Sequence, residues 1–233
     1  MQPRFLAFTT LATLATLATT SFQAQADTVA LWDYTAGTTK QTQSANGASF
    51  AALGAITISP TAAGVSGNAL STTTYAAQST GDLSRGVQYY IDTSGYTNLL
   101  LTFAQRNSAT ASAWTALLYT LDGSTWTAAT NFQMPASAST TFVGGISYNF
   151  ASILGANDNA NFGIELLATY APGTSAYTAT GSGSSYGTAG TIRYDNVLLS
   201  GTPIAEAVPE PETYALMLAG LGLLGLVARR RAR

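Results

Sequence analysis

The chain has 233 residues, of which 9% are charged, and it contains no cysteine and no histidine. Its length fits one folded domain with processing segments at the ends. The missing residue types exclude a disulfide framework, a Cys nucleophile, a Ser-His-Asp triad and the usual zinc sites. Residues 27–206 hold nine acids against four bases, a net charge of −5. We therefore expect no nucleic-acid partner, because phosphates attract a basic surface.

The first 26 residues have the organisation of a secretory signal peptide. Arg4 supplies the positive charge near its start, and residues 5–22 are weakly apolar. Ala24 and Ala26 are the small residues that signal peptidase reads, which predicts cleavage just before Asp27. The competing interpretation is an uncleaved anchor or a buried helix, which the many threonines of the segment disfavour.

Residues 27–201 are predicted to form an all-β domain. Thr, Val, Ile, Tyr and Phe alternate with polar residues between Gly, Asn and Asp, and helical periodicity is nearly absent. The alternation predicts nine strands, at residues 29–34, 55–59, 86–91, 98–105, 113–121, 125–131, 141–149, 161–168 and 190–199. Eight or nine short strands in a domain of this size indicate a two-sheet β-sandwich of jelly-roll type.

Alternate positions in two consecutive strands are apolar and should face the core. They are Val87, Tyr89 and Ile91 in the first, and Leu99, Leu101 and Phe103 in the second. Asp122 and Gly123 lie between two further predicted strands. This dipeptide predicts a tight hairpin, because both residues accept positive φ values.

Three phrases of the domain resemble strands of carbohydrate-binding-module-like jelly rolls. Residues 118–126 are similar to a hairpin common in such folds, in which a strand is followed by an Asp-Gly turn and then by Thr-Trp. Residues 159–166 resemble the penultimate strand, and residues 192–197 resemble the closing strand. The resemblance is to a fold that hosts many functions, so it implies an architecture and no particular substrate.

The resemblance to the closing strand implies a structural calcium ligand at Asp195, and no other cofactor is expected. Asp33 in the first strand is its expected partner, because first and last strands often lie together and calcium prefers carboxylate and carbonyl oxygens. The alternative is that Asp195 and Asn196 form a bulge or a turn and bind no ion.

Trp32, Trp114 and Trp126 are the candidate ligand-binding residues, since an exposed indole can stack on a sugar ring. The commoner role of such residues is half-buried packing. Residues 171–189 form a long segment without a regular pattern, which is either a binding loop or disordered. The absence of charge in that segment favours disorder.

The domain shows no recognisable catalytic constellation. Glu165 is its one Glu, beside seven Asp, and no two acids form the pair that a glycosidase needs. We therefore expect a non-catalytic surface or matrix protein whose sandwich contacts exopolysaccharide or other matrix partners. The alternative is a secreted carbohydrate-active enzyme that uses a carboxylate pair.

The C-terminal segment has three parts. Residues 202–212 form an acidic, Pro-rich linker, residues 213–228 are apolar and uncharged, and residues 229–233 are basic. The distinctive residues are Pro209, Glu210 and Pro211 in the linker and Arg229, Arg230 and Arg231 in the tail. The sixteen apolar residues predict a single transmembrane helix, although a rise of about 24 Å is short for a ~30 Å hydrocarbon core. The arginines should stay in the cytoplasm.

This order of motif, apolar segment and arginines resembles the PEP-CTERM sorting signal. The resemblance implies recognition by exosortase, a membrane-embedded, Cys-dependent transpeptidase or protease that removes the tail. It also implies export, a transient stay in the inner membrane, and delivery to the cell surface or extracellular matrix, in the context of exopolysaccharide and biofilm or floc formation. The alternative is a plain C-terminal anchor without processing.

Overall fold

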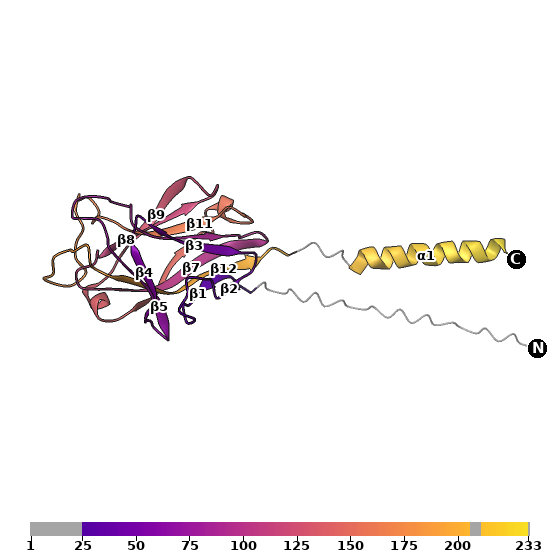
Figure 1. The fold of residues 1–233 in the computed structure, drawn as a ribbon. Helices are drawn as coiled ribbons and strands as arrows, with labels where there is room; N and C mark the ends of the chain where they lie inside the picture. Colours follow the sequence, from indigo (N-terminus) through magenta and orange to yellow (C-terminus); the bar gives the residue numbers. More distant parts are fainter. Residues whose placement is uncertain (1–24, 206–210, 233) are drawn as a thin grey trace, which may run out of the picture.

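The computed structural model describes residues 25–205 and 211–232. Most of the predicted signal peptide, including Ala24, lies outside these residues, as do Pro209 and Glu210. Residues 25–205 form two antiparallel β-sheets that pack face to face, and Figure 1 shows the two layers. The all-β, two-sheet sandwich predicted from the sequence is confirmed.

The larger sheet has seven strands. Five of them follow one another in the order β10 (Val143–Asn149), β7 (Tyr96–Asn107), β12 (Ile192–Pro203), β1 (Asp27–Trp32) and β2 (Gln43–Ser44). The other two are β5 (Asn68–Thr73), which also pairs with β12, and β4 (Thr57–Ala63), which pairs with β5. Strand β12 thus contacts β7, β1 and β5, and it organises this sheet.

The smaller sheet has five strands. Their order is β3 (Ala48–Leu53), β6 (Gly86–Ile91), β11 (Gly163–Ala168), β8 (Trp114–Thr120) and β9 (Trp126–Gln133). The central strand β11 is buried along its whole length. Two short 3-10 helices, η1 (Ala136–Ser139) and η2 (Leu154–Ala156), lie in the connections.

Each of the nine predicted strands overlaps an observed one, but β2, β3 and β5 are not predicted by the sequence pattern. Strand β2 has only two residues, and β3 is half alanine and lacks β-branched side chains. Strand β3 nevertheless pairs with β6 over all six of its residues. These strands exist because neighbouring strands offer hydrogen-bonding edges, which local propensity does not report.

The predicted inward-facing positions are confirmed. Val87, Tyr89 and Ile91 in β6, and Leu99, Leu101 and Phe103 in β7, are all at most 2% exposed. The two strands belong to opposite sheets. Their apolar faces therefore meet across the core, where they join one hydrophobic cluster.

Aromatic contacts tie the sheets together. Trp32 of β1 contacts Tyr89 of β6 edge-on, with ring centroids 4.7 Å apart. The hydroxyls of Tyr34 and Tyr89 share a buried hydrogen bond of 2.8 Å. Burial raises the pKa of both phenols, so both stay protonated at any physiological pH.

The hairpin predicted at Asp122 and Gly123 is confirmed, since β8 and β9 pair on either side of it. The backbone conformation of the turn differs in part from the expectation. Gly123 has a positive φ of 76°, whereas Asp122 is not among the positive-φ residues. The Asp122 carboxylate instead accepts hydrogen bonds from the backbone amides of Ser124 and Thr125, at 2.8 and 2.6 Å. These bonds hold the pKa of Asp122 well below its usual range.

Residues Pro211–Arg231 form the helix α1, which ends in Arg229, Arg230 and Arg231. Its described leucines are exposed, so they do not pack into the sandwich core. Among the residues that the structure describes, no helix is long and apolar enough to cross a membrane. The predicted transmembrane helix is therefore not supported. The physical reason is the apolar stretch of sixteen residues, which is too short for a ~30 Å hydrocarbon core.

Candidate functional site

Asp33 and Asp195 lie close together because β1 and β12 are neighbours, with Trp32 opposite Val197 in the register. Burial raises the pKa of Asp195, and the negative charge of Asp33 adds to this effect. The Asp195 carboxylate accepts hydrogen bonds from the amides of Val65 (2.7 Å) and Asn196 (2.8 Å). The structure thus brings the predicted pair together, and Asp195 also anchors the loop between β4 and β5.

The alternative interpretation of Asp195 also has a structural basis. Asn196 has a positive φ of 50°, and the pairing of β12 with β7 shifts register between Asp195 and Leu198, which is a β-bulge. Among the described residues, no group of three or more His, Cys, Asp or Glu side chains surrounds a common point. Calcium binding by Asp33 and Asp195 stays a prediction.

A melting experiment tests this prediction. If the pair binds calcium, 1–5 mM CaCl2 should raise the Tm relative to EGTA, because a ligand that binds only the folded state stabilises it by about 2.7 kcal/mol at 100 times its Kd. Asp33→Asn should abolish the shift. Asp158→Asn, an exposed carboxylate elsewhere, should keep it. Equal melting curves in calcium and EGTA would contradict the prediction.

The three tryptophans have different environments. Trp32 is fully buried against Tyr89, so its proposed role in sugar stacking is wrong. Trp114 and Trp126 are partly exposed and begin β8 and β9. Trp126 packs against a small apolar cluster of Ala116, Leu118 and Leu167 on the outer face of the smaller sheet.

Glu165 lies on the same outer face, between Gln88 of β6 and Leu118 of β8 in the register. It is 7% exposed, and burial raises the pKa of its carboxyl to about 7. The shift has burial as its cause, with no contribution from a second carboxylate. Glu165 therefore resembles a general acid in its pKa, and among the described residues no second carboxylate contributes to that shift, as one would in the close carboxylate pair of a glycosidase.

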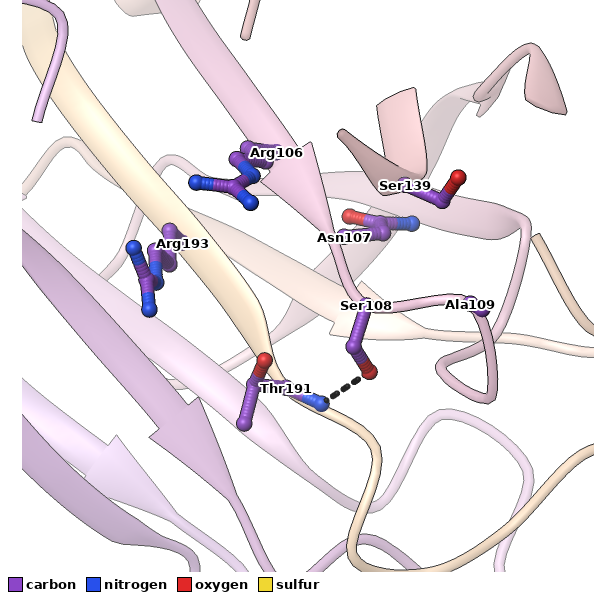
Figure 2. A pocket seen from close by; sticks show the side chains of 7 residues that line it. All are labelled: Arg106, Asn107, Ser108, Ala109, Ser139, Thr191 and Arg193. Atoms are coloured by element: carbon purple, nitrogen blue, oxygen red, sulfur yellow. Dashed lines mark hydrogen bonds between the residues drawn. The ribbon is translucent and has the colours of Figure 1, made fainter. Parts of the chain in front are cut away.

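The sequence reasoning missed a cationic pocket on the larger sheet. Arg106 of β7 and Arg193 of β12 lie directly opposite each other, and Figure 2 shows both guanidinium groups beside the two strands. The pocket has a volume of about 160 Å³. Its other lining residues are Asn107, Ser108, Ala109, Ser139 and Thr191. The sequence contains one indication of this pocket: two of the domain's four basic residues, Arg106 and Arg193, occupy outward positions of long strands.

A second cavity, of about 620 Å³, lies at the loop of residues 171–189. Tyr177 is 3% exposed and stacks on Tyr186 with ring centroids 4.5 Å apart. The hydroxyls of these residues donate hydrogen bonds to the carbonyls of Gly81 and Ala76, at 2.8 and 2.7 Å. The expected disorder of this loop is therefore wrong, because aromatic packing orders it without any charge.

The basic end of helix α1 is described, and its arginines are exposed. A family model for the PEP-CTERM protein-sorting motif matches residues 207–231, which include the Pro-Glu-Pro, the apolar segment and Arg229 to Arg231. No curated protein matches the chain significantly. The chain thus carries a PEP-CTERM sorting motif, which implies an exported or surface protein sorted by exosortase. The likeness of the sandwich to carbohydrate-binding modules stays a prediction.

Proposed function

We propose that this protein is delivered to the cell surface or extracellular matrix after removal of both ends, and that its non-catalytic sandwich contacts exopolysaccharide. The observation that carries the proposal is a PEP-CTERM motif at residues 207–231 joined to a two-sheet β-sandwich. Signal peptidase and exosortase would be its partners during export. Biofilm or floc formation would be the setting in which the sandwich acts.

The architecture supports removal of the tail without damage to the sandwich. Strand β12 pairs with β7 as far as Pro203, and the amide of Ile204 donates a hydrogen bond of 2.8 Å to the carbonyl of Gly95. Helix α1 begins at Pro211. A cut near the Pro-Glu-Pro would therefore fall beyond the last sheet hydrogen bonds, so the remaining domain would keep all of its strands.

The motif also has the chemistry of a protease handle. Pro209 and Pro211 restrict φ on either side of Glu210 and disfavour helix for the residues before them, so the sequence of the motif favours the extended form that a protease cleft accepts. The N-terminal end agrees with this scheme, since β1 begins at Asp27, the residue that signal peptidase would leave first. Asp27 pairs with Gly201, so the mature chain would start inside the sheet.

A non-catalytic role is supported by the surroundings of Glu165. Burial alone raises its pKa, and its register partners on the two neighbouring strands are Gln88 and Leu118. The alternative, a carbohydrate-active enzyme, would require a second carboxylate across a cleft from Glu165. Sugar contact by Trp114 and Trp126 is compatible with their partial exposure.

Binding of purified exported protein to a panel of neutral and acidic polysaccharides tests the proposal. We expect binding to at least one polymer, without release of reducing sugar. Release of reducing ends that disappears in Glu165→Gln would favour the enzyme instead. No binding to any polymer in the panel, including the host's own exopolysaccharide, would contradict the sugar contact.

A further inference from the structure

Two basic residues meet in one pocket of an otherwise acidic domain. Arg106 and Arg193 are direct partners in the antiparallel register of β7 and β12. Like charges directly opposite each other on neighbouring strands are destabilising. The fold therefore carries a local repulsion that a single substitution at either position would remove.

The other described residues that line the pocket beside the two arginines are uncharged. Arg193 donates a hydrogen bond of 3.2 Å to the carbonyl of Ala63, which is uncharged. Burial, and then the positive charge of Arg106, lower the pKa of Arg193. Among the described residues that line the pocket, none is acidic. The pocket thus holds two positive charges beside hydroxyl and amide groups.

Hydrogen bonds and buried neighbours fix the backbone that carries the two arginines of the pocket. Gln105 and Asn107, on either side of Arg106, are buried, and Asn107 donates a hydrogen bond of 2.9 Å to Thr180. The amide of Thr191 donates a hydrogen bond of 2.8 Å to the Ser108 hydroxyl (Figure 2). This bond joins the two chain segments at the end of the pocket, just after β7 ends and just before β12 begins. The backbone positions of both arginines are therefore fixed.

We infer that this pocket binds one oxyanion of an acidic polysaccharide, a uronate carboxylate or a sulfate ester, between the guanidinium groups of Arg106 and Arg193. A guanidinium presents paired N–H donors that match the oxygens of a carboxylate or sulfate. An anion between the two would replace their repulsion with two attractions. The volume of about 160 Å³ admits one such group and part of its sugar ring.

The inference rests on the proposed contact with exopolysaccharide and narrows it to acidic polymers. A sugar fits the pocket better than a protein segment does, because the lining is polar apart from Ala109 and offers hydroxyls rather than an apolar wall. The net charge of −4 of the domain (eight acids against four bases in residues 27–201) opposes a polyanion at long range. The local pair must therefore supply the attraction, and binding should weaken as salt increases.

Binding of the exported protein to polygalacturonate, dextran sulfate and neutral dextran tests the inference. We expect at least one acidic polymer to bind more tightly than dextran, and Arg106→Ala and Arg193→Ala each to weaken that binding by about tenfold or more. Arg106→Lys should fall in between, because it keeps the charge but loses the planar fork. Lys40→Ala, which removes an exposed positive charge outside the pocket, should bind like the wild type.

An NMR titration tests anion binding in the pocket separately from polysaccharide binding by the whole protein. Free glucuronate and inorganic sulfate should shift the NMR signals of the Arg106 and Arg193 side-chain Nε–H groups but not that of Arg85. Unshifted signals, or arginine variants that bind like the wild type, would overturn the pocket even if polysaccharide binding persists. Shifted signals without binding to either acidic polymer would overturn the polysaccharide assignment. Tighter binding of an acidic peptide than of either polymer would do the same.

Discussion

Replacement of both Pro209 and Pro211 by alanine should leave the C-terminal segment attached to the exported protein. A proline disfavours helix at the residue before it, whereas two alanines would let helix α1, which begins at Pro211, extend toward the linker. A helical segment does not fit a protease cleft that accepts extended chain. Mass spectrometry of the protein recovered from cells should find a full C-terminus in the double variant and a shortened one in the wild type.

A matched control separates the motif from a general effect of proline. Pro172 is exposed in a loop of the sandwich, and Pro172→Ala should be processed like the wild type. The amount of protein at the cell surface should fall with the double variant and stay the same with the control. Identical C-termini in wild type and double variant would mean that the Pro-Glu-Pro is not a processing signal.

Glu165→Gln should stabilise the sandwich at pH 8 by about 1–2 kcal/mol, a value smaller than the full pKa shift implies because solvent screens part of the carboxyl. Burial raises the pKa of Glu165 from its ordinary value of 4.5 to about 7. The folded state therefore binds the proton more tightly than the unfolded state does. In the wild type this contribution to stability is complete below pH 4.5 and is lost as the pH rises to about 7.

The stability gain of Glu165→Gln should depend on pH over the same range, from pH 4.5 to about 7. Urea unfolding should give nearly equal stabilities below pH 4.5, with a difference that grows up to about pH 7 and is constant above it. Asn131→Gln, a change at an exposed, uncharged position of the same sheet, should give a difference from the wild type that does not change with pH. A stability difference that does not change with pH would place Glu165 in a solvated rather than a buried setting.

The strands that the sequence predicts are those whose side chains alternate strongly. Leu99, Leu101 and Phe103 are a clear example, because every second side chain of β7 there faces the core. Strand β3 could not be predicted in this way, since its alanines carry little β-propensity and its pairing with β6 comes from tertiary context. The assignment of β6 and β7 to different sheets is likewise a property of the topology, which local pattern does not contain.

The candidate sites show the same limit. The neighbourhood of Asp33 and Asp195 could be anticipated, because it needs only the pairing of the first and last strands. The Arg106–Arg193 pair depends on the register of β12 against β7, which bulges shift at two places. The predicted exposure of Trp32 is wrong because its burial depends on Tyr89 in the opposite sheet. The C-terminal motif needed no tertiary context, since its three parts are contiguous in sequence.

The most direct test of export and removal of both ends is the intact mass of the wild-type protein recovered from the cell surface or the extracellular fraction. The proposed processing would give a chain that begins at Asp27, ends near the Pro-Glu-Pro beyond the last sheet residue Pro203, and lacks Arg229 to Arg231, apart from any mass added by surface attachment. Recovery of the protein only from the cytosol, or of an exported chain that still carries its terminal arginines, would contradict it.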